Sequence, residues 1–320
     1  MDPATISIAS SASASYLFPL AAMLRSLVNH LNPRCSIEAY VIDAGMPDTE
    51  KRRLEQSFAS DRVQIHWCQV DESRLKGLPC WGGMGPATYY RLLLPDVLPA
   101  STNRVLWLDA DVIVLGDIAE IWTTPFDGSA LLAAQDMMVP YIGSAFGVKR
   151  HRMLELPPNA PYFNAGMMCI DLEWWRRNNV PEAVLSYLRR HSRSVYYYDQ
   201  DGLNAILCGK WRRVECRWNV IASVAGRRFY NSAHLNPYEY RTAIESPLVV
   251  HYGGAMKPWR VPLRGPLFAR FYEFLDQTKW QGWRPHYGWK DRLLGFYQGR
   301  LRDRFYVFES YRLRLLRFLG

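Results

Sequence analysis

Short apolar runs alternate with apolar residues at helical spacing along the first part of the chain. Strands are expected at residues 5–9, 36–43 and 63–67, and helices at residues 16–30 and 48–60 between them. This alternation predicts an α/β fold with a mainly parallel, doubly wound sheet, whose ligands bind beyond the carboxyl ends of the strands. The first strand is not followed by a G-x-G-x-x-G segment, so the dinucleotide-binding fingerprint is absent.

The apolar run at residues 104–117, RVLWLDADVIVLGD, is interrupted by two carboxylates, Asp109 and Asp111. Such a run predicts a buried strand, in which each desolvated charge costs roughly several kcal/mol unless a cation or hydrogen-bond donors compensate it. A turn at Ala110 would let both carboxylates converge at the end of the strand, where hard oxygen donors suit Mg²⁺ or Mn²⁺ carrying phosphates. The alternative, one solvent-facing Asp and one helix N-cap, stays open on this segment alone.

Three further polar residues lie near the ends of predicted elements. Arg91 belongs to a predicted helix at residues 87–94, directly after a glycine-rich loop at residues 81–86. Asp136 ends one apolar strand and Asn164 lies at the beginning of another. Each has an ordinary explanation, as a surface arginine, a strand end or a turn-forming Asn. Arg91 could equally face phosphates or Asp109.

A cluster of polar residues follows three consecutive tyrosines at the start of a predicted helix, and its members are Asp199, Gln200 and Asp201. A carboxylate stabilises a helix N-terminus by about 0.3–1 kcal/mol, so capping explains one acid. It does not require two acids or the tyrosines. Aromatic rings beside carboxylates also suit the C–H faces and hydroxyls of sugars, and we favour sugar binding here.

A predicted strand near residue 250 leads into a glycine turn with His251 at its end and Lys257 shortly after. Histidine can complete a carboxylate metal site, glycines such as Gly254 let backbone N–H groups approach a phosphate, and lysine neutralises its charge. Taken alone, His251 is also explained as a hydrogen-bonded core or turn residue.

The composition indicates a soluble globular protein with reduced thiols. The chain has 320 residues, of which 49% are apolar, and no run of about 18 apolar residues suited to crossing a bilayer. The N-terminus carries an acid, Asp2, where a signal peptide carries positive charge. Six cysteines without a C-x-x-C pair argue against a zinc site and for a cytoplasmic location.

The formal net charge of +9 is concentrated at the C-terminus. Residues 281–320 hold nine Lys and Arg against three Asp and Glu, and residues 290–320 place aromatic and leucine residues at helical spacing between arginines. This pattern predicts a basic amphipathic helix on an anionic membrane, where each cation contributes about 1 kcal/mol. The alternative is a helix packed on the body. We therefore divide the chain into a domain at residues 1–280 and a membrane-association segment at residues 281–320.

Taken together, the segments VIDAG at 41–45, TYYR at 88–91, LWLDADV at 106–112, YFNAG at 162–166, DQD at 199–201 and HYGGAMKPW at 251–259 resemble the family-8 retaining glycosyltransferases. The resemblance is to bacterial lipo-oligosaccharide and lipopolysaccharide galactosyl- and glucosyltransferases in particular. It implies a GT-A nucleotide-binding fold and transfer of galactose or glucose from a UDP-sugar to a glycan or glycolipid acceptor. The implied cofactor is Mn²⁺, with Mg²⁺ as the alternative.

The resemblance also assigns roles by position. The implied metal ligands are Asp109, Asp111 and His251, and Gly254 and Lys257 would contact the diphosphate. The remaining implied donor-binding residues, around the sugar and nucleoside, are Ser10, Ser11, Arg91, Ala110, Asp136 and Asn164. Gln200 matches the residue beneath the reacting carbon, and because an amide is a poor nucleophile we favour front-face attack, with Asp199 as the alternative carboxylate nucleophile.

One departure from the family concerns the nucleotide. The lipo-oligosaccharide enzymes have an Asp-Asp-Asn-Tyr type segment after the first strand, whereas residues 10–15 here read SSASAS. The glycine loop at residues 82–85 also lacks a histidine of the family. A non-catalytic nucleotide-sugar or glycan-binding protein is therefore the alternative function. Nucleic-acid binding rests only on the basic C-terminus and is disfavoured.

Overall fold

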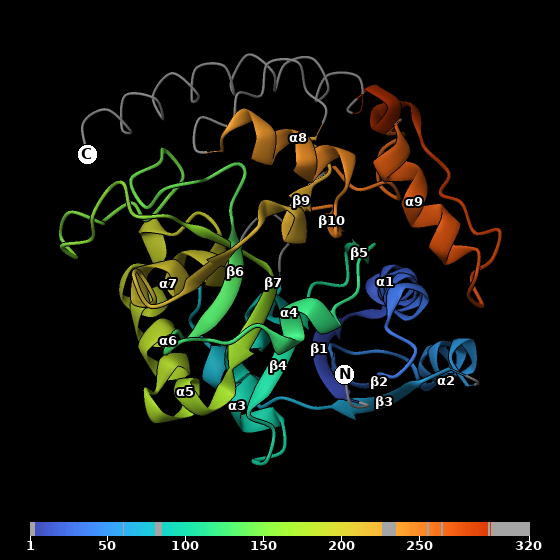
Figure 1. Ribbon diagram of the computed structural model, residues 1–320, viewed down its shortest axis with the longest axis horizontal. Helices are drawn as coiled ribbons and strands as arrows, with labels where there is room; N and C mark the ends of the chain where they lie inside the picture. Colours follow the sequence, from blue (N-terminus) through green and yellow to red (C-terminus); the bar gives the residue numbers. More distant parts are fainter. Residues whose placement is uncertain are drawn as a thin grey trace.

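A seven-stranded sheet forms the centre of the protein in the computed structural model (Figure 1). The structure describes residues 4–59, 61–80, 85–225, 235–254, 256–263, 265–293 and 295. The strand order is β3-β2-β1-β4-β7-β6-β8. Most of the predicted C-terminal helix, residues 296–320, lies outside the described residues.

The N-terminal half of the sheet follows the predicted alternation. β1 (Thr5–Ala12), β2 (Ser36–Asp43) and β3 (Val63–Cys68) are parallel, and α1 (Leu17–His30) and α2 (Asp48–Ser57) connect them. β1 was predicted to end at residue 9 but includes Ser10 and Ser11, because its backbone pairs with β2 as far as Ala12. The parallel, doubly wound arrangement of this half is confirmed.

The C-terminal half of the sheet is mixed. β4 (Arg104–Leu108) is parallel to β1, but β7 (Phe163–Asp171) runs antiparallel between β4 and β6 (Leu131–Gln135). β8 (Arg212–Val214) at the edge is parallel to β6. The sheet is therefore mainly parallel, as predicted, with β7 as the exception.

The single strand predicted over residues 104–117 is wrong in one respect, because the chain changes sheets within it. β4 ends at Leu108, the chain turns, and β5 (Val112–Val114) joins a second, three-stranded sheet. There β5 pairs antiparallel with β10 (Val249–His251), and β9 (Val220–Ile221) pairs with the other side of β10. The predicted turn at Ala110 is confirmed.

Helices cover both faces of the main sheet. The group α5 (Leu172–Arg177), α6 (Val180–Arg190) and α7 (Tyr198–Ile206) lies on one side, and α1 and α9 (Pro266–Leu275) lie on the other (Figure 1). Side chains of β1 divide between two buried apolar clusters: Ile6 and Ile8 belong to the cluster with α1 and α9, and Ala9 belongs to the cluster with α6 and α7. The alternation of strand side chains thus fills a core on each face.

The remaining helical segments are short. The α-helix predicted at residues 87–94 is instead a 3₁₀ helix, η3 (Pro86–Leu93), continued by α3 (Leu94–Val97). η5 (Cys216–Asn219) precedes β9, and two further α-helices are α4 (Ala119–Thr123) and α8 (Pro237–Glu245). The other 3₁₀ helices are η1 (Ala14–Tyr16), η2 (Glu72–Leu75) and η4 (Ser192–Ser194). Within the described ranges, no helix is both long and apolar enough to span a membrane.

Candidate active site

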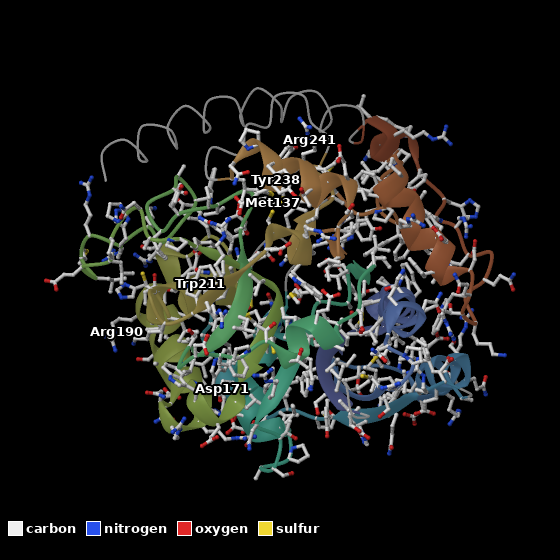
Figure 2. The ribbon with its side chains drawn as sticks, viewed as in Figure 1. Met137, Asp171, Arg190, Trp211, Tyr238 and Arg241 are labelled. Carbon is white, nitrogen blue, oxygen red and sulfur yellow. The ribbon has the colours of Figure 1, made fainter. Side chains whose placement is uncertain are left out.

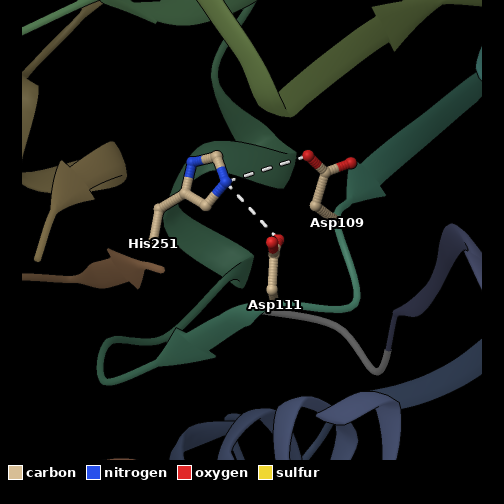
Figure 3. A group of neighbouring side chains, drawn as sticks. All are labelled: Asp109, Asp111 and His251. Carbon is tan, nitrogen blue, oxygen red and sulfur yellow. Dashed lines mark ion pairs between the residues drawn. The ribbon is translucent and has the colours of Figure 1, made fainter. Parts of the chain in front are cut away.

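Two carboxylates and one imidazole meet where the two sheets adjoin. Asp109 follows β4 and Asp111 precedes β5, and the Val112 N–H donates to the Asp109 carbonyl at 3.2 Å to close the turn between them. β10 pairs with β5 so that His251 lies opposite Val112. Nε2 of His251 is consequently 3.4 Å from Oδ1 of Asp111 and 3.8 Å from Oδ2 of Asp109 (Figure 3).

The donor set of this cluster fits a divalent cation. One ligand atom from each of the three side chains lies within 4.8 Å of the others. Oδ1 of Asp111 is buried and has no hydrogen-bond partner among the residues that the structure describes, which is an unfavourable state for a carboxylate oxygen unless a cation compensates it. Two carboxylates and one imidazole are ligands that Mn²⁺ and Mg²⁺ accept. The site therefore meets the requirements for the metal that the resemblance implies.

Lys257 is the cation nearest to this cluster. Its buried Nζ forms an ion pair with Oδ2 of Asp111 and donates to the Tyr252 carbonyl at 2.9 Å. Nζ also lies 5.6 Å from the ring centroids of Tyr16 and of Trp259, so the lysine stands between two aromatic faces. Burial opposes the charge of both partners, but their mutual attraction outweighs it, so that the pKa of Asp111 is lowered and the pKa of Lys257 is raised.

Arg91 joins the metal cluster to the start of α7. Its guanidinium is buried, with Nη2 2.9 Å from Oδ1 of Asp109 and Nε 2.8 Å from Oδ2 of Asp199. It lies over the ring of Trp107, whose Nε1 donates to Asp109 at 2.8 Å. Burial raises the pKa of Asp199 to about 6 against the opposing charge of Arg91. Arg91 therefore contacts Asp109, one of the roles that the sequence left open, and its burial rules out the alternative of an ordinary surface arginine.

A chain of amide hydrogen bonds runs from the imidazole to Gln200. His251 Nδ1 and Oδ1 of Asn219 are 3.0 Å apart, and Nδ2 of Asn219 donates to Oδ1 of Asn164 at 2.9 Å. Nδ2 of Asn164 and Nε2 of Gln200 then donate to the same oxygen of Asp136, at 2.7 and 3.2 Å. Three residues predicted separately, Asp136, Asn164 and Gln200, thus form one connected network with the candidate metal ligand.

Asp201 has a structural role and does not join this network of hydrogen bonds. Its carboxylate accepts hydrogen bonds from the hydroxyl of Tyr162 at 2.6 Å and from the backbone N–H groups of Tyr196 and Tyr197 at 2.5 and 3.2 Å. Burial raises the pKa of Asp201 to about 6, although these hydrogen bonds oppose the shift. The prediction that the cluster at residues 199–201 binds a sugar is therefore wrong for Asp201, because its oxygens accept hydrogen bonds from the turn before α7.

The serine segment lies at the end of β1, next to β2. Ser10 and Ser11 pair with Val41 and Ile42 of β2, and the buried Ser10 Oγ has no hydrogen-bond partner within the described ranges. Ala110 is buried in the turn between the two carboxylates. Gly254, with φ of +72°, supplies a turn after β10 that other residues rarely adopt. The glycine loop at residues 81–84 lies outside the described residues.

Three further residues of the site were given no role by the sequence. Asn219 orients the imidazole from η5, a segment for which we predicted nothing. Gly166 lies so close to His251 that a Cβ built on it would be 2.3 Å from Cε1 of the ring, so only glycine fits there. Trp107 belongs to the quoted LWLDADV segment and Gly166 to the quoted YFNAG segment, but neither was assigned a role. Nothing in the composition marks any of the three.

The sequence model for glycosyl transferase family 8 matches residues 7–261. The chain belongs to glycosyltransferase family 8. It is a glycosyltransferase, as the resemblance predicted, and the match covers every residue of the candidate site described above.

Curated relatives cover most of this family-8 chain. It is 29% identical over 276 residues to General stress protein A of Bacillus subtilis, covering 85% of this chain and 94% of that protein. It is 25% identical over 277 residues to lipopolysaccharide 1,2-glucosyltransferase of Escherichia coli, covering 86% and 79%. A third relative, 27% identical over 252 residues and covering 78% and 72%, is lipopolysaccharide 1,3-galactosyltransferase of Salmonella typhimurium.

Solved structures agree on the fold of this family-8 protein. The galactosyltransferase LgtC in complex with donor and acceptor sugar analogs superposes with a TM-score of 0.74 at 24% identity, covering 85% of this chain and 96% of that one. The mainly parallel α/β sheet is thus a GT-A fold, and this prediction is confirmed.

Proposed function

We propose that the protein is a retaining hexosyltransferase that moves galactose or glucose from a UDP-sugar to a glycan or glycolipid acceptor in the synthesis of a lipopolysaccharide-type cell-surface polysaccharide. The names of two relatives, a lipopolysaccharide glucosyltransferase and a lipopolysaccharide galactosyltransferase, support the reaction class. The proposed cofactor is Mn²⁺, with Mg²⁺ as the alternative.

The observation that carries the proposal is the convergence of Asp109, Asp111 and His251 beside Lys257. Among the described residues, the four carboxylates of the site, those of Asp109, Asp111, Asp136 and Asp199, face two permanent cations, Arg91 and Lys257. A divalent ion would balance the remaining two negative charges. A metal bound there supplies Lewis-acid stabilisation of the negative charge that develops on a departing nucleoside diphosphate.

The protein's own residues then divide the remaining work. We assign the diphosphate to Lys257 and to the backbone at Gly254, which lie six and three residues after the end of β10. Arg91, Asp136 and Asn164 would orient the hydroxyls of the donor sugar. We assign the nucleoside to the end of β1 and the turn after β4, where Ser10, Ser11 and Ala110 lie.

The engaged state of Asp199 bears on how the anomeric configuration is retained. Its Oδ2 lies 2.8 Å from Arg91 Nε and its Oδ1 accepts from Thr88 Oγ1 at 3.4 Å. A carboxylate paired with a cation in this way is a weaker nucleophile, because the positive charge stabilises its lone pairs. Gln200 also donates and accepts within the protein, to Asp136 and from the Ala165 N–H. We therefore favour front-face attack, with Gln200 beside the reacting carbon and Asp199 as the alternative nucleophile.

We propose a cytoplasmic location at the inner face of the membrane for this enzyme. The proposed membrane contact through residues 281–320, and the division of the chain at residue 280, rest on the sequence pattern.

The function is tested by a screen of UDP-glucose, UDP-galactose and other nucleotide sugars for Mn²⁺-dependent hydrolysis and transfer. Wild-type protein should hydrolyse at least one donor, and Asp111→Asn should lose this activity while keeping its circular dichroism spectrum. Asp48→Asn, an exposed carboxylate on α2, serves as the matched control. Full activity of Asp111→Asn would refute the metal assignment.

The second candidate is a non-catalytic nucleotide-sugar or glycan-binding protein with the same fold. The observation behind it is the serine segment, which offers no carboxylate or stacking aromatic to a base. Calorimetry with UDP and Mn²⁺ discriminates between the two, because binding without turnover of any donor would favour this candidate over the enzyme.

A further inference from the structure

A group of exposed cations lies on two segments beside the site. Lys149, Arg150 and Arg152 belong to the long connection between β6 and β7, and Arg190 and Arg193 lie at the end of α6 and in η4 (Ser192–Ser194). We call these five residues the cationic surface. Figure 2 shows Arg190 at the margin of the molecule on the side of α5 to α7, away from α9.

Side-chain contacts hold the two segments of the cationic surface together. Nε of Arg150 donates to the hydroxyl of Ser194 at 3.1 Å. The ring of Tyr196, two residues further on, packs edge-on against Phe146 at 5.4 Å and lies 5.5 Å from Nζ of Lys149. The cations therefore form a fixed surface, because the connection and the segment before α7 are packed against each other.

The charges of this surface are not neutralised by the protein. Throughout the described part of the chain, none of the five cations forms an ion pair with a carboxylate, whereas the neighbouring Arg189 lies 3.7 Å from Glu182. Like charges gathered without acidic partners repel one another, so the arrangement favours an anionic ligand. A surface of this kind raises the local concentration of anions.

An exposed apolar side chain accompanies the cations. Met153 is 73% exposed, and Nη1 of Arg150 lies 3.8 Å from its sulfur. The backbone turns at this point, since the N–H of Met153 donates to the Arg150 carbonyl at 2.9 Å and Glu155 follows with a φ of +55°. Cations around an exposed apolar tip are the composition of a segment that rests in the interface of a bilayer.

We propose that the cationic surface docks on an anionic phospholipid bilayer, with the five cations at the headgroups and Met153 inserted between them. Phosphates of a nucleic acid would satisfy the same cations, but Met153 would contribute nothing there, so the bilayer explains one more observation. The docked surface lies next to the segment that leads into Asp199, which would bring the site close to a lipid-linked acceptor. Only this last consequence rests on the proposed function.

The test is co-sedimentation of the full chain with vesicles of phosphatidylcholine alone and of equal parts phosphatidylcholine and phosphatidylglycerol. The variant R152Q/R190Q/R193Q should bind the anionic vesicles on the order of a hundredfold more weakly than wild type, because the loss of each cation weakens binding about fivefold and three are removed. The control R52Q/K76Q/K210Q removes three exposed cations elsewhere and should bind within a few-fold of wild type. Met153→Ser should also weaken binding, by less than the triple variant.

Equal anionic-vesicle binding by the triple variant and its control would overturn the proposal. It would also be overturned if the triple variant lost salt-sensitive DNA binding and kept its vesicle binding, which would assign the surface to nucleic acid. Unfolding temperatures of all variants establish that they fold. The proposed transferase function is judged separately, because the absence of donor hydrolysis by wild-type protein would leave the vesicle result unaffected.

Discussion

Nδ1 of His251 lies 3.0 Å from Oδ1 of Asn219, and both side chains are buried. Because a carboxamide oxygen only accepts, this contact places the imidazole proton on Nδ1 and leaves the lone pair of Nε2 facing Asp109 and Asp111. A histidine that ligates a metal usually has its other nitrogen held in this way. Asn219 is therefore a positioning residue for the candidate metal ligand.

Replacing Asn219 by Ala should weaken Mn²⁺ binding by about 10–100-fold, since the ring loses the partner that fixes its orientation and its proton. Calorimetric titration of Mn²⁺ into the two proteins measures this. Asn159→Ala, an exposed asparagine in the connection between β6 and β7, is the control and should bind like wild type. An unchanged affinity in Asn219→Ala would show that the hydrogen bond does not support the ligand.

Gly166→Ala should disturb the same imidazole from the other side. The added Cβ would lie 2.3 Å from Cε1 and 2.7 Å from Nδ1 of His251, so the ring must move. We expect a loss of about 1–3 kcal/mol in the free energy of unfolding, together with weaker Mn²⁺ binding. Chemical denaturation with and without Mn²⁺ checks both effects. Gly288→Ala, where the nearest atom is 3.4 Å away, should change neither.

Lys257→Met should destabilise the metal-free protein strongly. Lys257 compensates the buried charge of Asp111, and removing one partner of a buried ion pair costs about 3–5 kcal/mol. Mn²⁺ should then raise the unfolding temperature of the variant more than that of wild type, because the metal provides the missing positive charge. Thermal unfolding in EDTA and in Mn²⁺ measures the difference. A variant as stable as wild type in EDTA would contradict this account, and Lys76→Met is the exposed control.

Asp201 should make the protein less stable as the pH rises from 3.8 to about 6. Burial raises its pKa in the folded state from 3.8 to about 6, so its contribution to stability is complete below 3.8 and is lost as the pH rises through the folded value. The change corresponds to about 3 kcal/mol. In Asp201→Asn this part of the slope should disappear, as measured by urea denaturation across that pH range. The slope of Asp48→Asn should match that of wild type.

The sequence predicted the local elements well and the long-range pairings less well. β2 was predicted to the residue, since turn residues border a clear apolar pattern on both sides. The antiparallel insertion of β7 was not predicted, because strand order depends on contacts between distant segments. Nor does a continuous apolar run show that the chain leaves one sheet after Leu108 and enters another at Val112.

In the candidate site, too, residues marked by a local pattern were predicted and residues that depend on distant contacts were not. Asp109 and Asp111 were conspicuous because two charges interrupt an apolar run, and that anomaly is local. His251 drew attention only beside glycines and Lys257, and its approach to the carboxylates depends on the pairing of β10 with β5. Asn219 could not be identified, and Gly166 was quoted within YFNAG without a role, because the importance of both residues lies in their distance to His251.

The change of sheets between Asp109 and Asp111 has a consequence for biosynthesis. When the ribosome has made β5, both carboxylates exist, but the strand that carries His251 is still far from synthesis. β5 finds its antiparallel neighbour only after β10 has emerged, so the centre cannot assemble while the chain is nascent and incomplete. A polypeptide that ends before Val249 would keep the strands of the main sheet but lack His251 and Lys257, so the candidate centre requires synthesis to continue past β10.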